Sequence, residues 1–188
     1  AVVGSHAWVA DSQRGVRALD ISDPSTPRVV TSMILDDERY AIAASGSLVL
    51  TRHRGGLAVI DVSTPTAPVL LGTSGPVGQD VDIAATGSLA VVAIGEQGIR
   101  VVDFSTPSAP FVVGSLETAG YAWGVALAGT LAYVADGEEG LRIIDISTPM
   151  STATSTPGIG TTEAPAEISA RRVASLRQWR ATASMSRR

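Results

Sequence analysis

The chain has 188 residues, of which 45% are apolar and 17% are charged, a composition typical of a folded globular domain. The net charge of −4 gives no case for nucleic-acid binding, and the lack of cysteine excludes disulfides and thiolate-bound metal. Two histidines leave little room for a zinc site, so we expect neither a metal nor a cofactor. No run of about 18 apolar residues is present, so we expect no membrane span.

Internal repetition is the dominant signal along the chain. Four segments share a glycine, an apolar run and an aspartate followed by Ser and Pro: GVRALDISDPSTP (15–27), GLAVIDVSTPTAP (56–68), GIRVVDFSTPSAP (98–110) and GLRIIDISTPMST (140–152). Spacings of 41, 42 and 42 residues separate their aspartates, which are Asp20, Asp61, Asp103 and Asp145. A second set keeps the same register with spacings of 42, 41 and 42: Gly4, Gly46, Gly87 and Gly129.

Each unit divides into four short segments that are typical of β-strands and are bounded by Gly, Pro, Asp or Ser-Thr clusters. In the last unit, together with the segment before it, these are residues 110–117, 121–129, 131–136 and 141–147. Some segments are apolar almost throughout, as expected for strands buried on both faces. Four strands in about 42 residues is the period of a propeller blade. We therefore predict an all-β fold, a β-propeller or an open fragment of one, with about four four-stranded blades stacked on each other.

The repeated motif, in forms such as GLAVIDVSTP and GIRVVDFSTP, resembles the LVIVD repeat of bacterial and archaeal β-propellers. The resemblance covers roughly residues 1–149. The sequence departs from the motif in three places. The first unit has Asp23-Pro24, the second unit is one residue shorter than the others, and the pattern stops after Pro149. The resemblance implies a propeller from a secreted or cell-surface protein, and therefore an extracellular or cell-surface location.

The repeated aspartates have two interpretations. Each ends an apolar strand, where a carboxylate can accept hydrogen bonds from turn amides. The alternative is a ring of catalytic or cation-binding carboxylates. Every repeat needs the same turn whereas only one site would need chemistry, which favours a structural role for Asp20, Asp61, Asp103 and Asp145. The repeated glycines are expected at positive φ in hairpins: Gly15, Gly56, Gly98 and Gly140.

Catalytic constellations are scarce, and we assign no catalytic residue. His6 stands where its three counterparts are leucine, so we interpret it as a substitution at an apolar position. His53 is expected in a hairpin loop between two arginines. The acidic run at 136–139 lacks the calcium-loop pattern and is interpreted as a solvated turn.

Positions that vary between units are candidate recognition positions. By analogy with other propellers, residues 121–129 and their equivalents form the innermost strands, and ligands bind where these strands start. The hairpin loops 11–15, 52–55, 94–98 and 136–140 are expected at that same end. Alignment on the glycines places five varying residues there: Arg39, Tyr40, Asp80, Asp82 and Trp123.

These five residues suggest two kinds of site. Tyr40 and Trp123 would supply flat stacking area, unless they fill the core between blades, and the other three would be polar partners. Asp80 and Asp82 share one face of a strand and would form a carboxylate pair or one side of a Ca²⁺ site. The preferred alternative for this pair is two solvated acids at a channel mouth.

The two ends of the chain differ from its repeats. Residues 1–4 match the end of an inner strand, without an initiator Met or a signal peptide, so we expect a fragment whose further blades belong to a parent protein. Residues 1–150 carry eight arginines and 16 acidic residues, whereas residues 151–188 carry six arginines and two acidic residues. We divide the chain into propeller repeats at 1–149 and a Ser/Thr/Pro-rich linker with a basic tail at 150–188. The tail, which has a pattern consistent with a helix, is best explained as a frameshifted or otherwise non-native end.

We therefore expect a non-enzymatic binding or scaffold module whose ligand is a protein or a carbohydrate. Blade faces and strand edges left open would make the chain self-associate. The alternative is an extracellular hydrolase or lactonase-like propeller with a cation at the channel mouth. The two differ in the supply of carboxylates near the axis, where the sequence offers Asp80 and Asp82.

Overall fold

The computed structural model describes residues 1–11, 14–35, 41–53, 56–78 and 82–148. The first sheet holds β1 (Val2–Val3), β2 (His6–Asp11), β3 (Gly15–Asp20) and β4 (Arg28–Met33). The second holds β5 (Ile42–Ser45), β6 (Leu48–His53), β7 (Gly56–Asp61) and β8 (Val69–Pro76). The third holds β9 (Asp82–Thr86), β10 (Leu89–Ala93), β11 (Ile99–Asp103) and β12 (Phe111–Leu116). The fourth holds β13 (Gly124–Ala128), β14 (Leu131–Ala135) and β15 (Leu141–Asp145), with a 3₁₀ turn at Gly137–Glu139.

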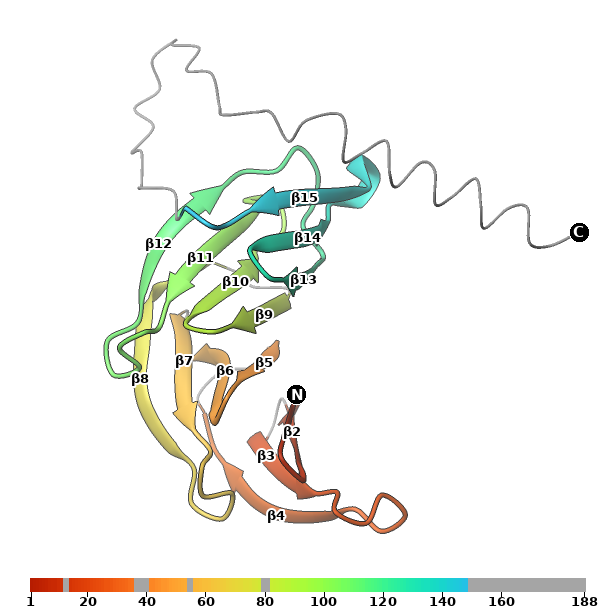
Figure 1. The fold of residues 1–188 in the computed structure, drawn as a ribbon, viewed down its shortest axis with the longest axis vertical. Helices are drawn as coiled ribbons and strands as arrows, with labels where there is room; N and C mark the ends of the chain where they lie inside the picture. Colours follow the sequence, from red (N-terminus) through yellow and green to blue (C-terminus); the bar gives the residue numbers. More distant parts are fainter. Residues whose placement is uncertain (12–13, 36–40, 54–55, 79–81, 149–188) are drawn as a thin grey trace, which may run out of the picture. The chain divides into compact units, whose positions relative to one another are not determined.

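Each sheet is an antiparallel meander in chain order, so the predicted all-β architecture is confirmed (Figure 1). One grouping was wrong: residues 110–117 do not share a sheet with the three segments after them. Their strand β12 pairs with β11 and forms the outer edge of the third sheet. In each four-stranded sheet the outer strand therefore comes last. The predicted linker and tail, residues 150–188, lie outside the described residues, and no helix within the described ones is long and apolar enough to cross a membrane.

The repeat seen in the sequence is reproduced in backbone conformation. Four glycines turn the chain from each first strand into the second, with φ values of 57°, 58°, 56° and 59°: Gly4, Gly46, Gly87 and Gly129. The pairing between the third strand and the outer strand has the same irregularity in all three four-stranded sheets. The register shifts between the two residues that precede the repeated aspartate, as between Val101 and Val102 ahead of Asp103. Such bulges increase strand twist, so each blade carries the same local bend.

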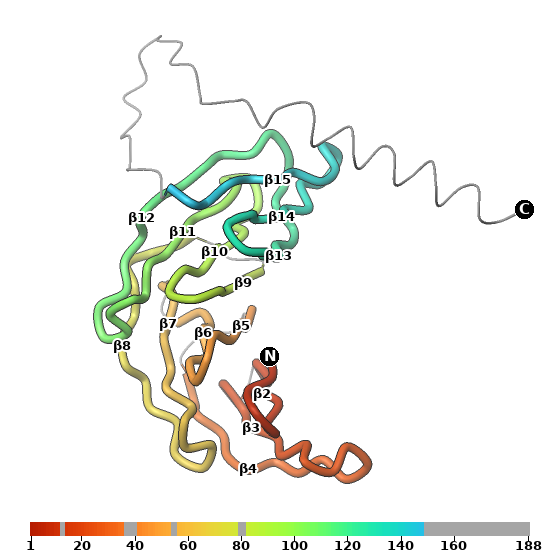
Figure 2. The backbone as a smooth tube through the Cα atoms, in the orientation of Figure 1, coloured from red at the N-terminus to blue at the C-terminus, as the bar shows by residue number. Residues whose placement is uncertain are grey.

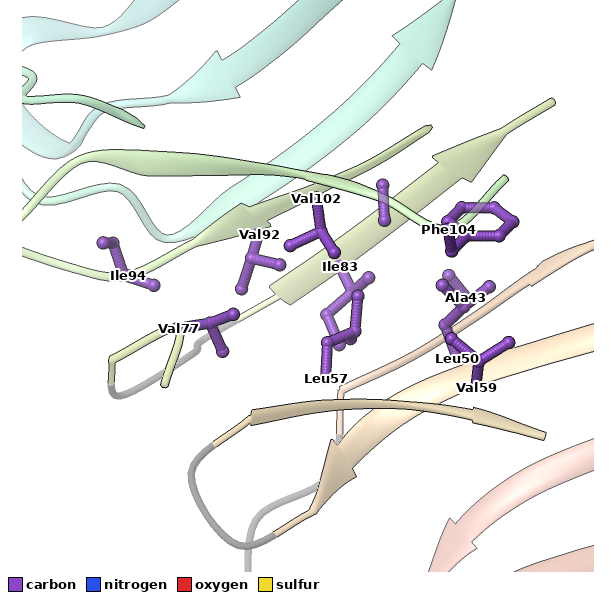
Figure 3. Packing of buried hydrophobic residues seen from close by; sticks show 11 residues of the cluster. Ala43, Leu50, Leu57, Val59, Val77, Ile83, Val92, Ile94, Val102 and Phe104 are labelled. Atoms are coloured by element: carbon purple, nitrogen blue, oxygen red, sulfur yellow. The ribbon is translucent and has the colours of Figure 1, made fainter. Parts of the chain in front are cut away.

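Three apolar cores lie between successive sheets. The second and third sheets enclose a cluster that includes Leu57, Val59, Val92 and Phe104 (Figure 3). In β10, Val92 belongs to this cluster, whereas its neighbour Val91 belongs to the cluster shared with the fourth sheet. Because side chains alternate along a strand, both faces of β10 are covered. Each such fully buried side chain contributes about 1.5–3 kcal/mol relative to exposure, so neighbouring sheets hold each other in place.

The first strands of the second, third and fourth sheets lie next to one another (Figure 2). Strand β9 contacts β5 on one side and β13 on the other. The starts of these strands therefore come together at one end of the sheets, which is where Asp82 and Trp123 lie.

The repeated hairpin glycines serve close packing as well as turn geometry. Gly15, Gly98 and Gly140 have φ values of 73°, 78° and 79°, as predicted, but Gly56 is not at positive φ. Its hairpin is one residue shorter: two residues separate the paired His53 and Gly56, whereas three separate the paired Asp11 and Gly15. A Cβ on Gly56 would overlap the carbonyl oxygen of Ser74, and one on Gly98 would overlap that of Leu116. The absence of a side chain therefore lets the outer strand approach the hairpin.

Two alanine substitutions separate the role of these glycines in turn geometry from their role in close packing. Gly87 and Gly98 both have positive φ, but a Cβ on Gly87 meets nothing within 4 Å. We expect Gly87→Ala to cost about 1 kcal/mol through backbone strain alone. Gly98→Ala should cost about 3 kcal/mol or more because β12 must also shift. Urea unfolding of both variants measures the difference, and equal costs would contradict the packing role.

Candidate functional site

The repeated aspartates close turns at the ends of the third strands. The first carboxylate oxygen of each accepts a hydrogen bond from the amide of the serine two residues on, at 2.7–2.9 Å: Asp20, Asp61, Asp103 and Asp145. Hydrogen bonds from the amide and the hydroxyl of Ser63 lower the pKa of Asp61 below its ordinary value. These carboxylates lie at the opposite end of each third strand from the hairpin loops. They are partly or fully exposed, so the turn bonds do not depend on burial.

Of the five predicted recognition residues, two are described. Arg39, Tyr40 and Asp80 lie outside the described residues. Asp82 starts β9, and its two carboxylate oxygens accept hydrogen bonds from the amides of Ile83 and Val125, both at 2.9 Å. Val125 belongs to β13, so the Asp82 side chain joins the first strands of two neighbouring sheets. Asp82 thus has a structural connection that sequence analysis did not foresee.

Trp123 lies just before β13 and is 59% exposed, so it does not fill the core between sheets. Its ring centroid is 4.3 Å from that of Tyr121, with the two planes tilted by 36°. The two aromatic side chains line an open hollow of about 470 Å³, which we call the Trp123 hollow. Thr118 and three carboxylates, Glu96, Glu138 and Glu139, line it as well, whereas Asp82 does not.

Backbone hydrogen bonds on both sides hold the extended segment that carries this aromatic pair. Ala122 and Gly95 exchange amide–carbonyl hydrogen bonds at 3.0 and 3.3 Å, and the amide of Trp123 donates to Ala135 at 2.9 Å. The chain is therefore extended here, with buried Ala122 between the two aromatic residues. Since alternate residues of an extended chain share a side, Tyr121 and Trp123 come to lie together. The 94–98 hairpin loop is thus at the start of β13, as predicted by analogy with other propellers.

Glycines allow the close approach of the surrounding loops. A Cβ on Gly95 would lie 2.7 Å from the Tyr121 ring, and one on Gly120 would overlap the carbonyl oxygen of Asp136. Gly137 packs on the backbone of Tyr121 in the same way, with a Cβ position 3.3 Å from its amide nitrogen. The Tyr121 ring therefore packs closely on Gly95, with the Trp123 ring beside it.

The interpretation of residues 136–139 as a solvated turn was wrong for its first residue. Asp136 is fully buried, forms an ion pair with Arg142 at 3.0 Å and accepts a hydrogen bond from the Gly120 amide at 3.2 Å. The carboxylate thus joins the β14–β15 hairpin to the segment that carries Tyr121. Glu138 and Glu139, by contrast, are exposed as expected.

The two histidines lie apart from this hollow. His6 is half-buried in β2, with its ring nitrogen 3.4 Å from the Ser5 hydroxyl. His53 ends β6 and is buried, so its predicted place in a loop was wrong. No group of three His, Asp or Glu side chains is arranged to hold a metal ion within the described ranges.

The model of the LVIVD repeat matches residues 1–34, 42–74, 77–118 and 119–155. The chain belongs to the LVIVD repeat family. No curated protein matches it. The four matched LVIVD repeats correspond to the four sheets, since each match begins at or just ahead of a sheet's first strand.

Solved structures share the fold at low sequence identity. The computationally designed Ika8 protein is 14% identical with a TM-score of 0.64, covering 80% of this chain and 46% of that one. BamB from Moraxella catarrhalis is 11% identical with a TM-score of 0.59, covering 76% of this chain and 41% of that one. The designed Ika4 protein is 11% identical with a TM-score of 0.58, covering 77% of this chain and 88% of that one. The chain spans less than half the length of the first two, and the likeness confirms the predicted β-propeller fold.

Sequence analysis named Trp123 as a candidate recognition residue but named neither Tyr121 nor the carboxylates around it as candidates. The signal for Tyr121 was present, because Tyr-Ala-Trp ahead of an LVIVD inner strand alternates aromatic, small and aromatic residues. Glu96 and Glu138 occupy equivalent positions in two hairpin loops that the sequence predicts at one end, but the spacing did not show that both loops line one hollow with Glu139. Glu96 lies more than 40 positions before the other two glutamates, and the three line one hollow because consecutive LVIVD blades are neighbours.

Acid should weaken the turn at Asp61. Because its pKa is lowered in the folded state, its contribution to stability is complete above about pH 4 and is lost as the pH falls through the folded-state pKa. Asp61→Asn keeps an acceptor but does not titrate, so its stability should fall less steeply than wild type below about pH 4. Asp61→Ala should be less stable at pH 7 as well. Urea unfolding at several pH values tests this, and parallel wild-type and Asp61→Asn profiles would contradict it.

The ion pair between Asp136 and Arg142 has a counterpart in the first LVIVD repeat whose carboxylate is more exposed. Asp11 and Arg17 occupy the positions of Asp136 and Arg142, at 3.3 Å, with 30% and 23% of their side chains exposed. We expect Asp136→Ala to cost about 2–3 kcal/mol because it removes a buried acceptor and leaves Arg142 unpaired. Asp11→Ala should cost less than about 1 kcal/mol. Thermal unfolding measures both, and similar costs would show that burial of Asp136 is unimportant.

Proposed function

We propose that this LVIVD propeller is a non-enzymatic binding module of a secreted or cell-surface protein, and that the Trp123 hollow is its binding site. The location is what the family resemblance implies. The observation that supports binding is an aromatic pair that is exposed and yet held by backbone hydrogen bonds on both sides. A rigid, exposed aromatic surface loses little side-chain entropy when it is covered by a ligand.

The fold itself does not require these aromatic residues. The other units carry Tyr40 or Val81 at the position of Trp123, and Glu38 or Gln79 at that of Tyr121. The repeated glycines and aspartates, by contrast, recur in every unit. Residues that vary between otherwise equal blades are free to serve recognition.

Binding can be tested with arrays of peptides and glycans probed with the full chain. Trp123→Ala removes the larger part of the exposed aromatic surface. Phe111→Ala is the matched control, because Phe111 is 54% exposed but lies on the outer strand β12, outside the hollow. Circular dichroism verifies that both variants are folded.

We expect at least one class of ligand to bind the wild type and the Phe111→Ala variant with similar affinity. The same ligand should bind the Trp123→Ala variant about tenfold or more weakly. If no peptide or glycan binds in a Trp123-dependent way, the hollow is not a binding site and the proposal fails.

A further inference from the structure

We propose that the Trp123 hollow binds a cationic side chain, in particular an arginine, presented by a basic segment of a partner protein. The inference rests on the proposed function, since it names the ligand class of the same site. It depends on the aromatic surface and on the charge around it.

The aromatic surface suits a cation. Indole is the side chain with the strongest cation–π attraction, and Trp123 leaves most of its surface uncovered. Tyr121 sits beside it and is itself 36% exposed, so the pair offers two π-systems to one ligand group. A planar guanidinium can stack on such rings, which a rounded ammonium cannot.

The charge around the hollow is of one sign. Glu96 comes from the β10–β11 loop, whereas Glu138 and Glu139 come from the 3₁₀ turn between β14 and β15. All three are exposed, and none of the described residues lining the hollow is basic. Arg142, on the strand that follows, is bound to the buried Asp136. An anion would be repelled here, whereas a cation would relieve the mutual repulsion of three carboxylates.

Arginine also suits the carboxylates of the hollow. Guanidinium carries five N–H donors and binds carboxylates through two parallel hydrogen bonds. Arginine therefore matches the rings and the carboxylates together.

The hollow has the size for one side chain and its backbone. Its volume of about 470 Å³ falls within the range of small-ligand sites, about 300–1,000 Å³. Because it is open, the peptide around the arginine can run along the surface rather than thread into the protein. A segment with one or two basic residues is thus sufficient.

Isothermal titration of the full chain with matched peptides tests the inference. The probe is a hexapeptide alternating arginine with glycine, and its controls replace arginine by lysine, by neutral citrulline or by glutamate. Citrulline keeps the shape and the stacking plane of arginine but removes the charge. A neutral oligosaccharide serves as a ligand of another class. The variants are the double substitution Glu138→Gln with Glu139→Gln, then Trp123→Ala, with Phe111→Ala as the control.

We expect the arginine peptide to bind about tenfold or more tightly than the citrulline peptide, with lysine between them and no binding of the glutamate peptide. The double glutamine variant should bind the arginine peptide about tenfold more weakly, and added salt should weaken wild-type binding. Equal affinity for arginine and citrulline, or no effect of the double substitution, would overturn the inference. If the arginine inference fails but the oligosaccharide binds in a Trp123-dependent way, the proposed binding function survives. If no peptide, oligosaccharide or array ligand binds in a Trp123-dependent way, the inference and the proposed function both fail.

Discussion

Burial of both apolar faces of the second and third sheets is the constraint on which this structure depends. Strands such as β10 send alternate side chains into two different cores, so neither face can be left to water. A sheet of four short strands cannot satisfy this demand alone, and its neighbours must cover it. The starts of the first strands are brought together as a consequence, and with them Asp82 and Trp123, which stand at positions that differ from one LVIVD repeat to the next.

The Trp123 hollow is built from this arrangement. Its carboxylates belong to two neighbouring blades, and its aromatic pair stands on the segment that connects them. Buried Asp136 and the glycines that allow close backbone approach fix the connection. The scaffold is therefore repeated, whereas the site arises where two repeats differ, which is how a repeat protein acquires one recognition surface without disturbing its cores.

Carboxylates in this chain have distinct roles according to their surroundings. Asp61 and its counterparts recur because each blade needs the same turn, and their bonds are local, two residues along the chain. Asp82 and Asp136 instead join segments that are distant in sequence, through backbone amides of Val125 and Gly120. The acids left exposed around the hollow, Glu96, Glu138 and Glu139, are those able to act on a ligand.

The sequence by itself determined the repeat, the four-stranded blades and the turn role of the aspartates, because these depend on local spacing and on interactions a few residues apart. It also located Trp123 as a position that varies between units. Only the tertiary structure decided that Trp123 is exposed, that Tyr121 lies beside it, that Asp136 is buried and that Glu96 joins Glu138 and Glu139. The physical reason is that burial and convergence arise from packing between blades, and the spacing within one repeat carries no information about which neighbouring loop will stand against it.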